Sequence, residues 1–189
     1  MRIIAGNRRG ALLTKLDANG TRPTADRVRE SLFNILQGGR FESRLAGTTV
    51  VDLFAGTGAL GLEALSRGAA HASFVENAPA ALAVLRANIA KLRYQPLSSV
   101  IAGDATRLAH WRGPAASLVF ADSPYATGAG LTAVCGLVRL GAIAPDSVII
   151  IETGKAEILD PGQLVQSRLD LAEQRHYGRA MLHFLRWAG

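Results

Sequence analysis

The segment Val50-Val51-Asp52-Leu53-Phe54-Ala55-Gly56-Thr57-Gly58-Ala59-Leu60-Gly61 indicates a buried strand, a glycine-rich turn and the start of a helix. Residues 48–54 are β-branched or apolar apart from Asp52, and we expect them to form a strand inside a parallel sheet. Gly56 and Gly58 allow tight turning and a close approach of ligand to backbone. The N–H groups at the start of the helix would face that ligand. This order of elements predicts a nucleotide-like ligand at the carboxyl edge of the first strand.

Asp52 bears on which ligand the turn binds. The spacing Gly56-x-Gly58-x-x-Gly61 also matches a dinucleotide fingerprint, so two classes of cofactor compete for it. A dinucleotide brings a pyrophosphate, which the carboxylate would repel, whereas S-adenosylmethionine brings a cationic amino acid group, which it would attract. A simpler alternative is that Asp52 only caps the turn. We therefore expect S-adenosylmethionine as the cofactor and S-adenosylhomocysteine as the product.

Length and composition favour one ordinary domain. The chain has 189 residues, of which 49% are hydrophobic, enough for a substantial core. No run of about 18 uncharged apolar residues predicts a membrane span, and the first residues lack the apolar region of a signal peptide. Cys135 is the only cysteine, and the four histidines show no ligand spacing. The sequence thus predicts a cytoplasmic protein without a metal, and we expect a monomer.

Positive charge is concentrated in the first quarter of the chain. The net charge is +6, and residues 1–44 hold nine Lys and Arg against four Asp and Glu. Such an excess favours a polyanion partner such as RNA, although a solvated arginine-rich surface is the alternative. We expect residues 1–20 to form a β-hairpin extension that contacts RNA, and residues 21–189 to form the main domain.

The candidate RNA contacts lie in two places. Arg8 and Arg9 fall in the loop between two expected short strands, 2–6 and 11–16. Thr24 is a good N-cap for a helix, and arginines at the N-terminal end of a helix suit phosphate better than helix stability. Pairing of these arginines with Asp26 and Glu30 is the structural alternative. The expected RNA-binding residues are Arg8, Arg9, Arg22, Thr24, Arg27 and Arg29.

Beyond the glycine-rich turn, strands and helices alternate and a hairpin closes the chain. We expect strands at 72–77, 98–104, 117–122 and 148–152, helices at 59–67, from 79 and at 130–140, and hairpin strands at 171–177 and 180–186. Glu76 ends the second strand 18 residues beyond Gly58, where an acid accepts ribose hydroxyls. Asp104 ends the third strand and suits the adenine amine, or it caps the next turn. The expected cofactor-binding residues are Asp52, Phe54, Ala55, Gly56, Gly58, Glu76, Asn77, Asp104 and Ala105.

Asp122-Ser123-Pro124-Tyr125 follows the fourth strand and would lie beside the cofactor crevice. The exocyclic amine of a base is a poor nucleophile, because its lone pair is delocalised into the ring. A carboxylate and a peptide carbonyl that accept its N–H bonds can aim the nitrogen at a methyl group and draw off charge. Tyr125 can stack on a base flipped out of its helix. The alternative is a proline turn with a core tyrosine.

Three stretches carry a resemblance to a known family. Asp52-Leu53-Phe54-Ala55-Gly56-Thr57-Gly58 resembles motif I of S-adenosylmethionine-dependent methyltransferases, and Asp122-Ser123-Pro124-Tyr125 resembles the motif of those that methylate exocyclic amines. The segment Thr21-Arg22-Pro23-Thr24-x-Asp26-Arg27-Val28-Arg29-Glu30-Ser31-Leu32-Phe33-Asn34 is the most specific of the three. Over essentially its whole length, the chain is similar to the RsmD family, bacterial methyltransferases of guanine N2 in 16S ribosomal RNA.

The resemblance implies a fold, a reaction and a partner. It implies a doubly wound α/β Rossmann-like sheet of seven strands with an antiparallel last strand, and an N-terminal hairpin that binds RNA. It also implies that the substrate is the small ribosomal subunit or its assembly intermediate rather than free RNA. By this resemblance Glu76 holds the ribose and Asp104 the adenine. Asp122, Ser123, Pro124 and Tyr125 then hold the target guanine.

Ser123 is the one departure from the family, and it keeps a non-catalytic function open. Ser123 stands where the family usually has proline, so the carbonyl acceptor survives while the fixed φ angle is lost. Adenine-N6 methylation of RNA or DNA is a close rival, and a non-catalytic rRNA-binding assembly factor is a rival of another class. Asp52 and the absence of an evident proton-transfer histidine argue against a nicotinamide oxidoreductase.

Overall fold

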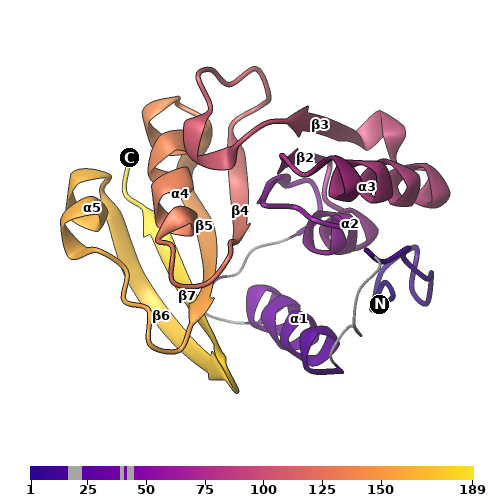
Figure 1. Cartoon of the computed structure of the whole chain (residues 1–189), viewed down its shortest axis with the longest axis horizontal. Helices are drawn as coiled ribbons and strands as arrows, with labels where there is room; N and C mark the ends of the chain where they lie inside the picture. The colour runs from indigo at the N-terminus through magenta and orange to yellow at the C-terminus, as the bar shows by residue number, and fades with distance from the viewer. Residues whose placement is uncertain (17–22, 39–40, 42–44) are drawn as a thin grey trace.

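The computed structural model describes residues 1–16, 23–38, 41 and 45–189, with only the backbone of residues 23–26. Within these residues a seven-stranded sheet has the order β3-β2-β1-β4-β5-β7-β6 (Figure 1). The first five strands run parallel, and β7 runs antiparallel to both of its neighbours. This confirms the doubly wound sheet with an antiparallel last strand. The strands are β1 (Thr49–Leu53), β2 (His71–Glu76), β3 (Ser98–Ala102), β4 (Ala116–Asp122), β5 (Ile143–Gly154), β6 (Leu169–Tyr177) and β7 (Ala180–Trp187).

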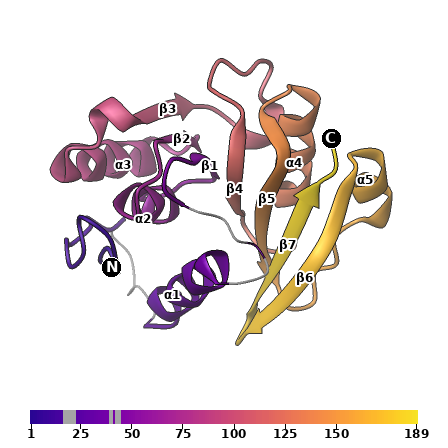
Figure 2. The same ribbon diagram turned by 180° about the vertical axis from the view of Figure 1, so that it is seen from behind.

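Helices cover both faces of the sheet (Figures 1 and 2). Alternate residues of each strand point to opposite faces, and both faces are apolar, as a buried parallel sheet requires. Val50, Phe74 and Phe120 pack in one cluster with α1, α2 and α3, and Val51, Val75 and Val119 pack in another with α4. The helices are α1 (Pro23–Gln37), α2 (Ala59–Ser66), α3 (Pro79–Leu92), α4 (Ala129–Arg139) and α5 (Pro161–Gln166), with short 3-10 turns η2 (Gln95–Leu97) and η3 (Ala105–Arg107). No helix in the described part of the chain has the length and apolarity to cross a membrane.

Two boundaries differ from the sequence prediction for identifiable reasons. Strand β1 ends at Leu53, because Phe54 has a φ of 57° and turns the backbone out of the extended conformation. Helix α1 begins at Pro23, so Thr24 lies inside its first turn and the prediction of Thr24 as the N-cap was wrong. Proline is favoured in the first turn of a helix, where its missing N–H would have no partner in any case.

The N-terminal segment forms a loop that lies on the main domain. Its two arms meet at one isolated bridge, between Arg2 and Leu12, in place of two regular strands. Glu63 of α2 accepts hydrogen bonds from the backbone N–H groups of Ile4 (2.7 Å) and Ala5 (3.0 Å). Gly6 lies so close to α2 that an added Cβ would come within 1.7 Å of the Ser66 carbonyl oxygen. The segment is therefore packed against α2 rather than projecting from it.

A buried asparagine ties the same segment to the glycine-rich turn. Asn88 of α3 is fully buried, and its amide exchanges two hydrogen bonds with the backbone of Thr14, at 2.7 and 3.1 Å. The same amide nitrogen donates to the carbonyl oxygen of Thr57 at 3.0 Å. One side chain thus satisfies backbone groups of two segments that no strand pairing connects.

Candidate active site

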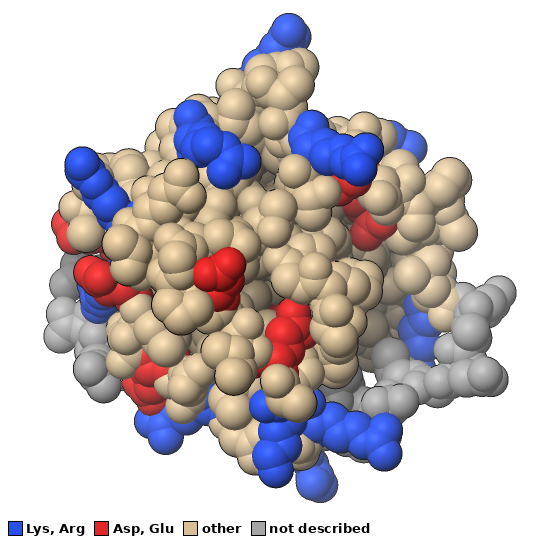
Figure 3. Space-filling view, turned by 60° about the vertical axis from the view of Figure 1, so that its left-hand side comes forward, with Lys and Arg blue, Asp and Glu red and all other residues tan. Residues whose placement is uncertain are grey.

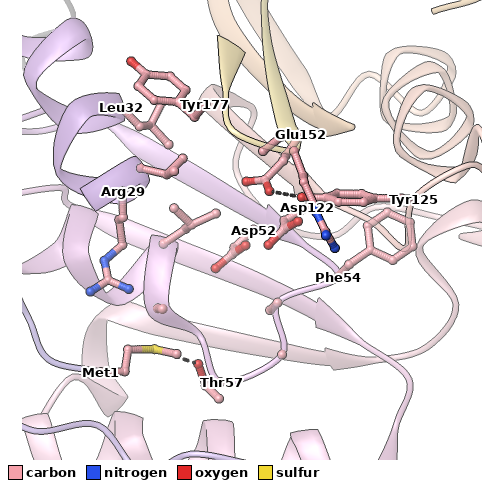
Figure 4. Close-up of a pocket in the computed structure, with 17 residues that line it drawn as sticks. Met1, Arg29, Leu32, Asp52, Phe54, Thr57, Asp122, Tyr125, Glu152 and Tyr177 are labelled. Carbon is pink, nitrogen blue, oxygen red and sulfur yellow. Dashed lines mark hydrogen bonds between the residues drawn. The ribbon is translucent and has the colours of Figure 1, made fainter. Parts of the chain in front are cut away.

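A cavity of about 340 Å³ opens where β1, β4 and β5 end at the carboxyl edge of the sheet (Figure 4). Helix α1 forms one wall of the cavity, and the β6–β7 hairpin forms another. Parallel sheets with helices on both faces bind ligands at this edge, where strand order reverses between β1 and β4. The lining residues are Met1, Val28, Arg29, Leu32, Asp52, Phe54, Ala55, Gly56, Thr57, Ala59, Leu60, Asp122, Tyr125, Glu152, Tyr177, Arg179 and Ala180.

The glycine-rich turn is shaped by residues in the left-handed region. Phe54, Gly56 and Gly58 have φ angles of 57°, 55° and 80°. At Gly58 a Cβ would lie 2.4 Å from a methyl carbon of Leu85, so packing as well as backbone conformation demands glycine there. At Gly56 a Cβ would meet only the Phe54 carbonyl oxygen, at 3.9 Å, because this residue faces the cavity. A ligand can therefore approach the backbone closely at Gly56.

Asp52 is both a cap and part of the cavity wall. Its side chain is 2% exposed, and its Oδ2 accepts a hydrogen bond from the Gly61 N–H at 2.9 Å. Burial raises the pKa of Asp52 to about 8, the Gly61 hydrogen bond opposes the shift, and the charges of Asp122 and Glu76 add to it. No ion pair joins Asp52 to a basic side chain of the described residues. The two interpretations of Asp52 from sequence are thus compatible, and the site favours a cationic ligand.

Glu76 holds the turn from the neighbouring strand. Its Oε2 accepts from the Gly56 N–H at 2.8 Å, and its Oε1 accepts from Asn77 (2.9 Å) and Ala78 (2.8 Å). A carboxylate has about four acceptor positions, so one remains for a ligand hydroxyl. Glu76 and Asn77 lie beside the cavity, not in its lining.

Asp104 accepts hydrogen bonds from a residue close to it in the sequence. Its Oδ1 accepts from the N–H and the hydroxyl of Thr106, at 2.9 and 2.7 Å, and these bonds lower the pKa of Asp104. The residue is the N-cap of η3, and Ala105 behind it is buried. Both residues lie outside the cavity lining, so their contact with an adenine stays a prediction.

Asp122, Glu152 and Tyr125 form the opposite side of the cavity (Figure 4). Asp122 and Glu152 are Cα partners at the ends of β4 and β5, and the Tyr125 hydroxyl donates to Oε1 of Glu152 at 2.6 Å. Asp122 is exposed to solvent through the cavity, and the protein packed around it partly desolvates its carboxylate. This desolvation, with the charge of Glu152, raises the pKa of Asp122 to about 7. Burial also raises the pKa of Glu152, and the Tyr125 hydrogen bond opposes that shift.

The loop that carries Tyr125 is fixed from its far side. Glu157 accepts from the backbone N–H groups of Ala126 and Gly128 at 2.6 and 3.0 Å. Ser123 is buried, whereas Pro124 is exposed and its carbonyl accepts from the Thr127 hydroxyl at 2.7 Å. A second hollow of about 560 Å³ lies along this loop and shares Tyr125 and Arg179 with the cavity. The loop is therefore held in place before any ligand binds.

The predicted RNA-binding arginines differ in their surroundings. Arg9 and Arg27 are exposed. Arg8 donates from Nε to the Leu92 carbonyl at 3.0 Å and lies over the Tyr94 ring, and Arg29 is buried in the cavity wall and donates to the Arg2 carbonyl at 2.6 Å. Arg22 and the side chain of Thr24 lie outside the described residues. Figure 3 shows Lys and Arg side chains gathered at the lower edge of one face, the edge to which the β6–β7 tip points in Figure 1.

Sequence reasoning did not include Glu152 or Arg179 among the site residues. Glu152 had a readable signal, since it ends the strand that follows Asp122, and parallel strand ends meet at one edge. Arg179 had none, because its place in the cavity depends on how the hairpin folds back beside β5.

The family model described as "Conserved hypothetical protein 95" matches residues 1–186. The protein named "Ribosomal RNA small subunit methyltransferase D" of Escherichia coli K12 is 37% identical over 153 residues, which cover 81% of this chain and 74% of that one. Its namesake in Haemophilus influenzae is 33% identical over 158 residues, covering 82% and 79%. The solved structure of the protein yhhF from Escherichia coli is 32% identical, with a TM-score of 0.81, and the match covers 100% of this chain and 99% of that one.

Proposed function

The chain belongs to the Conserved hypothetical protein 95 family, the RsmD family that its motifs resemble, and from this premise we propose its reaction. The protein transfers a methyl group from S-adenosylmethionine to the exocyclic N2 of a guanine in 16S RNA of the small ribosomal subunit. The observation that carries the proposal is the pair of acids, Asp52 and Asp122, on neighbouring strands at one cavity. Relatives named for ribosomal RNA methylation support the substrate class.

The residues on the β1 side fit S-adenosylmethionine. Burial raises the pKa of Asp52 to about 8, and the cationic amino acid moiety would supply a counter-ion for its carboxylate. Gly56 allows close approach, and Glu76 keeps one acceptor position for the ribose. The other proposed cofactor contacts are Phe54, Ala55, Asn77, Asp104 and Ala105. Gly58 contributes by fixing the conformation of the turn. When bound, this cofactor supplies an activated methyl group on a sulfonium and leaves as a neutral thioether.

The residues on the β4 side act on the amine. Asp122 and the carbonyl oxygen of Ser123 accept its two N–H bonds, so that the nitrogen lone pair points at the methyl carbon. The sulfonium would supply the methyl group, and Asp122 would take the proton that the nitrogen loses on methylation. A pKa raised to about 7 makes Asp122 a better proton acceptor than an ordinary carboxylate. Tyr125 stacks on the flipped base, and Pro124 shapes the turn between them.

RNA phosphates are contacted by the exposed arginines Arg9 and Arg27, and by Arg22 and Thr24. Arg8 and Arg29 support this surface from within, because their guanidinium groups hold internal carbonyls. The substrate is the subunit or its assembly intermediate in the cytoplasm, and the protein acts as a monomer.

The test uses S-adenosylmethionine with a labelled methyl group and small subunits from cells that lack the gene. After transfer, the RNA is digested and the labelled nucleoside is identified by mass spectrometry. Label in N2-methylguanosine is expected. Label in N6-methyladenosine would show that the methylated base is adenine and not guanine. No label despite measured cofactor binding would support a non-catalytic RNA-binding protein. The variant Asp122→Ala should lose transfer in this assay. Asp170→Ala is its matched control, since Asp170 is exposed on β6 and does not line the cavity.

A further inference from the structure

Glu152 is an acid in the cavity lining that has no role in the reaction proposed above. It lies near the carboxyl end of β5 beside Asp122, and Cα partners on adjacent strands project their side chains to the same face of a sheet. Both carboxylates line the cavity and lie side by side in Figure 4. Any base held by Asp122 therefore presents its adjoining atoms to Glu152.

The hydrogen bonds of Glu152 orient its carboxylate toward the cavity. Its Oε1 is held by the Tyr125 hydroxyl at 2.6 Å, and no hydrogen bond to Oε2 is made by the described residues. Tyr125 is the proposed stacking ring, so the same contact fixes the ring and the acid relative to each other. Two groups that are fixed in this way give precise recognition of a planar ligand.

The electrostatics of the acid pair call for hydrogen-bond donors. Asp122 and Glu152 are desolvated neighbours of like charge, and burial raises the pKa of each. Arg179 also lines the cavity, but no salt bridge to Asp122 or Glu152 occurs among the described residues. A ligand edge with two adjacent N–H donors would satisfy both carboxylates.

Guanine has such an edge and adenine does not. Guanine places the N1–H donor next to the N2 amine, so one acid can accept from each. Adenine places an unprotonated N1 beside its N6 amine, and that lone pair would face a carboxylate. A site built to accept an N–H rejects an analogue that lacks it, because the buried acceptor is left without a partner.

We propose that Glu152 is the residue that selects guanine, its Oε2 accepting the N1–H while Asp122 accepts from the N2 amine. The Tyr125 hydroxyl positions Glu152 for this contact. This inference rests on the proposed function, because it assumes that a guanine amine is the methyl acceptor.

The test compares guanine with 2-aminopurine at the methylated position of the small-subunit RNA. 2-Aminopurine keeps the 2-amino group but has no hydrogen on N1. Wild-type kcat/KM should fall roughly 10- to 100-fold on 2-aminopurine, the range for a lost hydrogen bond to a charged group. In Glu152→Gln the amide can donate to the bare N1, so the guanine preference should shrink at least tenfold.

Glu157→Gln is the matched control. It makes the same carboxylate-to-amide change in the loop contact behind Tyr125, outside the cavity lining. We expect it to leave the base preference unchanged, whatever it does to the rate. If Glu152→Gln slows both substrates equally, Glu152 is only structural and the inference is overturned. If the wild type methylates neither base while binding S-adenosylmethionine, the proposed function itself has failed.

Discussion

The two sides of the cavity satisfy their acids in different ways. On the β1–β3 side, three acids accept backbone N–H groups. Asp52 accepts from the start of α2, Glu76 from the glycine-rich turn after β1, and Asp104 from η3. On the β4–β5 side, Asp122 and Glu152 lie side by side, and the Tyr125 hydroxyl is the one hydrogen-bond donor to either acid among the described residues. The first side is preorganised by its own backbone. The second is completed by donors that a substrate brings, so substitutions on the two sides should have separable effects.

The largest effect is expected at Asp122. Asp122→Ala removes the acceptor that aims the amine, and transfer should fall by a factor of about 10³ or more. The Kd for S-adenosylmethionine should stay within about threefold, because the β1 turn is untouched. Single-turnover rates and calorimetric titration measure the two quantities. Equal losses of binding and transfer would show that the two sides do not act separately.

Asp52→Asn probes the β1 side. The amide oxygen can still accept the Gly61 N–H, but the negative charge is gone. S-Adenosylmethionine should bind roughly 10- to 100-fold more weakly, the range for a lost charged hydrogen bond. The affinity for RNA should not change. An unchanged cofactor Kd, measured by calorimetry, would refute the assignment of Asp52 to the cationic amino acid moiety.

The pH dependence of stability gives a second view of Asp52. Its pKa of about 8 in the folded chain lies above the ordinary 3.8, so the native state holds an extra proton between these values. The free energy of unfolding contributed by Asp52 therefore falls as pH rises through that window. Without cofactor, Asp52→Asn should gain stability relative to the wild type between pH 5 and about 8. Urea denaturation across this range measures the difference, and a constant difference would contradict the raised pKa.

Arg9→Ala should weaken RNA binding and leave the other measured properties unchanged. Arg9 is exposed. Losing one phosphate contact should reduce the steepness of the plot of log K for RNA binding against log salt concentration by about 0.7 to 0.9. Cofactor affinity should not change. Arg8→Ala is the contrast, because it removes the bond to the Leu92 carbonyl and should cost about 1 kcal/mol of stability. Filter binding at several salt concentrations decides whether Arg9 belongs to the RNA surface.

Ser123→Pro should have the smallest effect. It restores the residue that the related motif carries and fixes φ, and the carbonyl acceptor stays in place. We expect kcat to rise no more than about threefold, which is worth roughly 0.7 kcal/mol of barrier. Ser123 is buried, so a melting curve should accompany the kinetics. A drop in kcat without a drop in melting temperature would mean that the serine N–H is used.

Much of this architecture follows from local signals. The apolar strands, Gly56 and Gly58, and the acids at strand ends are local features, and the sheet edge brings their side chains together. Asp122 and Tyr125 were found because a short motif carries their chemistry. Local signals also placed the closing hairpin, whose turn is Gly178-Arg179.

What sequence could not supply depends on long-range packing. The contact between Tyr125 and Glu152 spans 27 positions, and Arg179 reaches the cavity only through β5–β7 pairing. The internal bond of Arg29 to the Arg2 carbonyl cannot be distinguished in sequence from a phosphate contact. The two short strands expected near the N-terminus reduce to one bridge, because the N–H of Gly10 donates to the Ile3 carbonyl and the N–H of Ala11 turns back to the Arg8 carbonyl.

The buried amide of Asn88 also sets an order of events during synthesis. It bonds Thr14, which is 74 positions earlier in the chain. The N-terminal segment is made first, yet its partners Glu63, Ser66 and Asn88 leave the ribosome much later. Closing loops of this length costs conformational entropy, which is offset only when α2 and α3 have formed and their side chains can bind the segment. Residues 1–16 should therefore be among the last parts of this domain to dock, because α3 must fold before Asn88 can bind them.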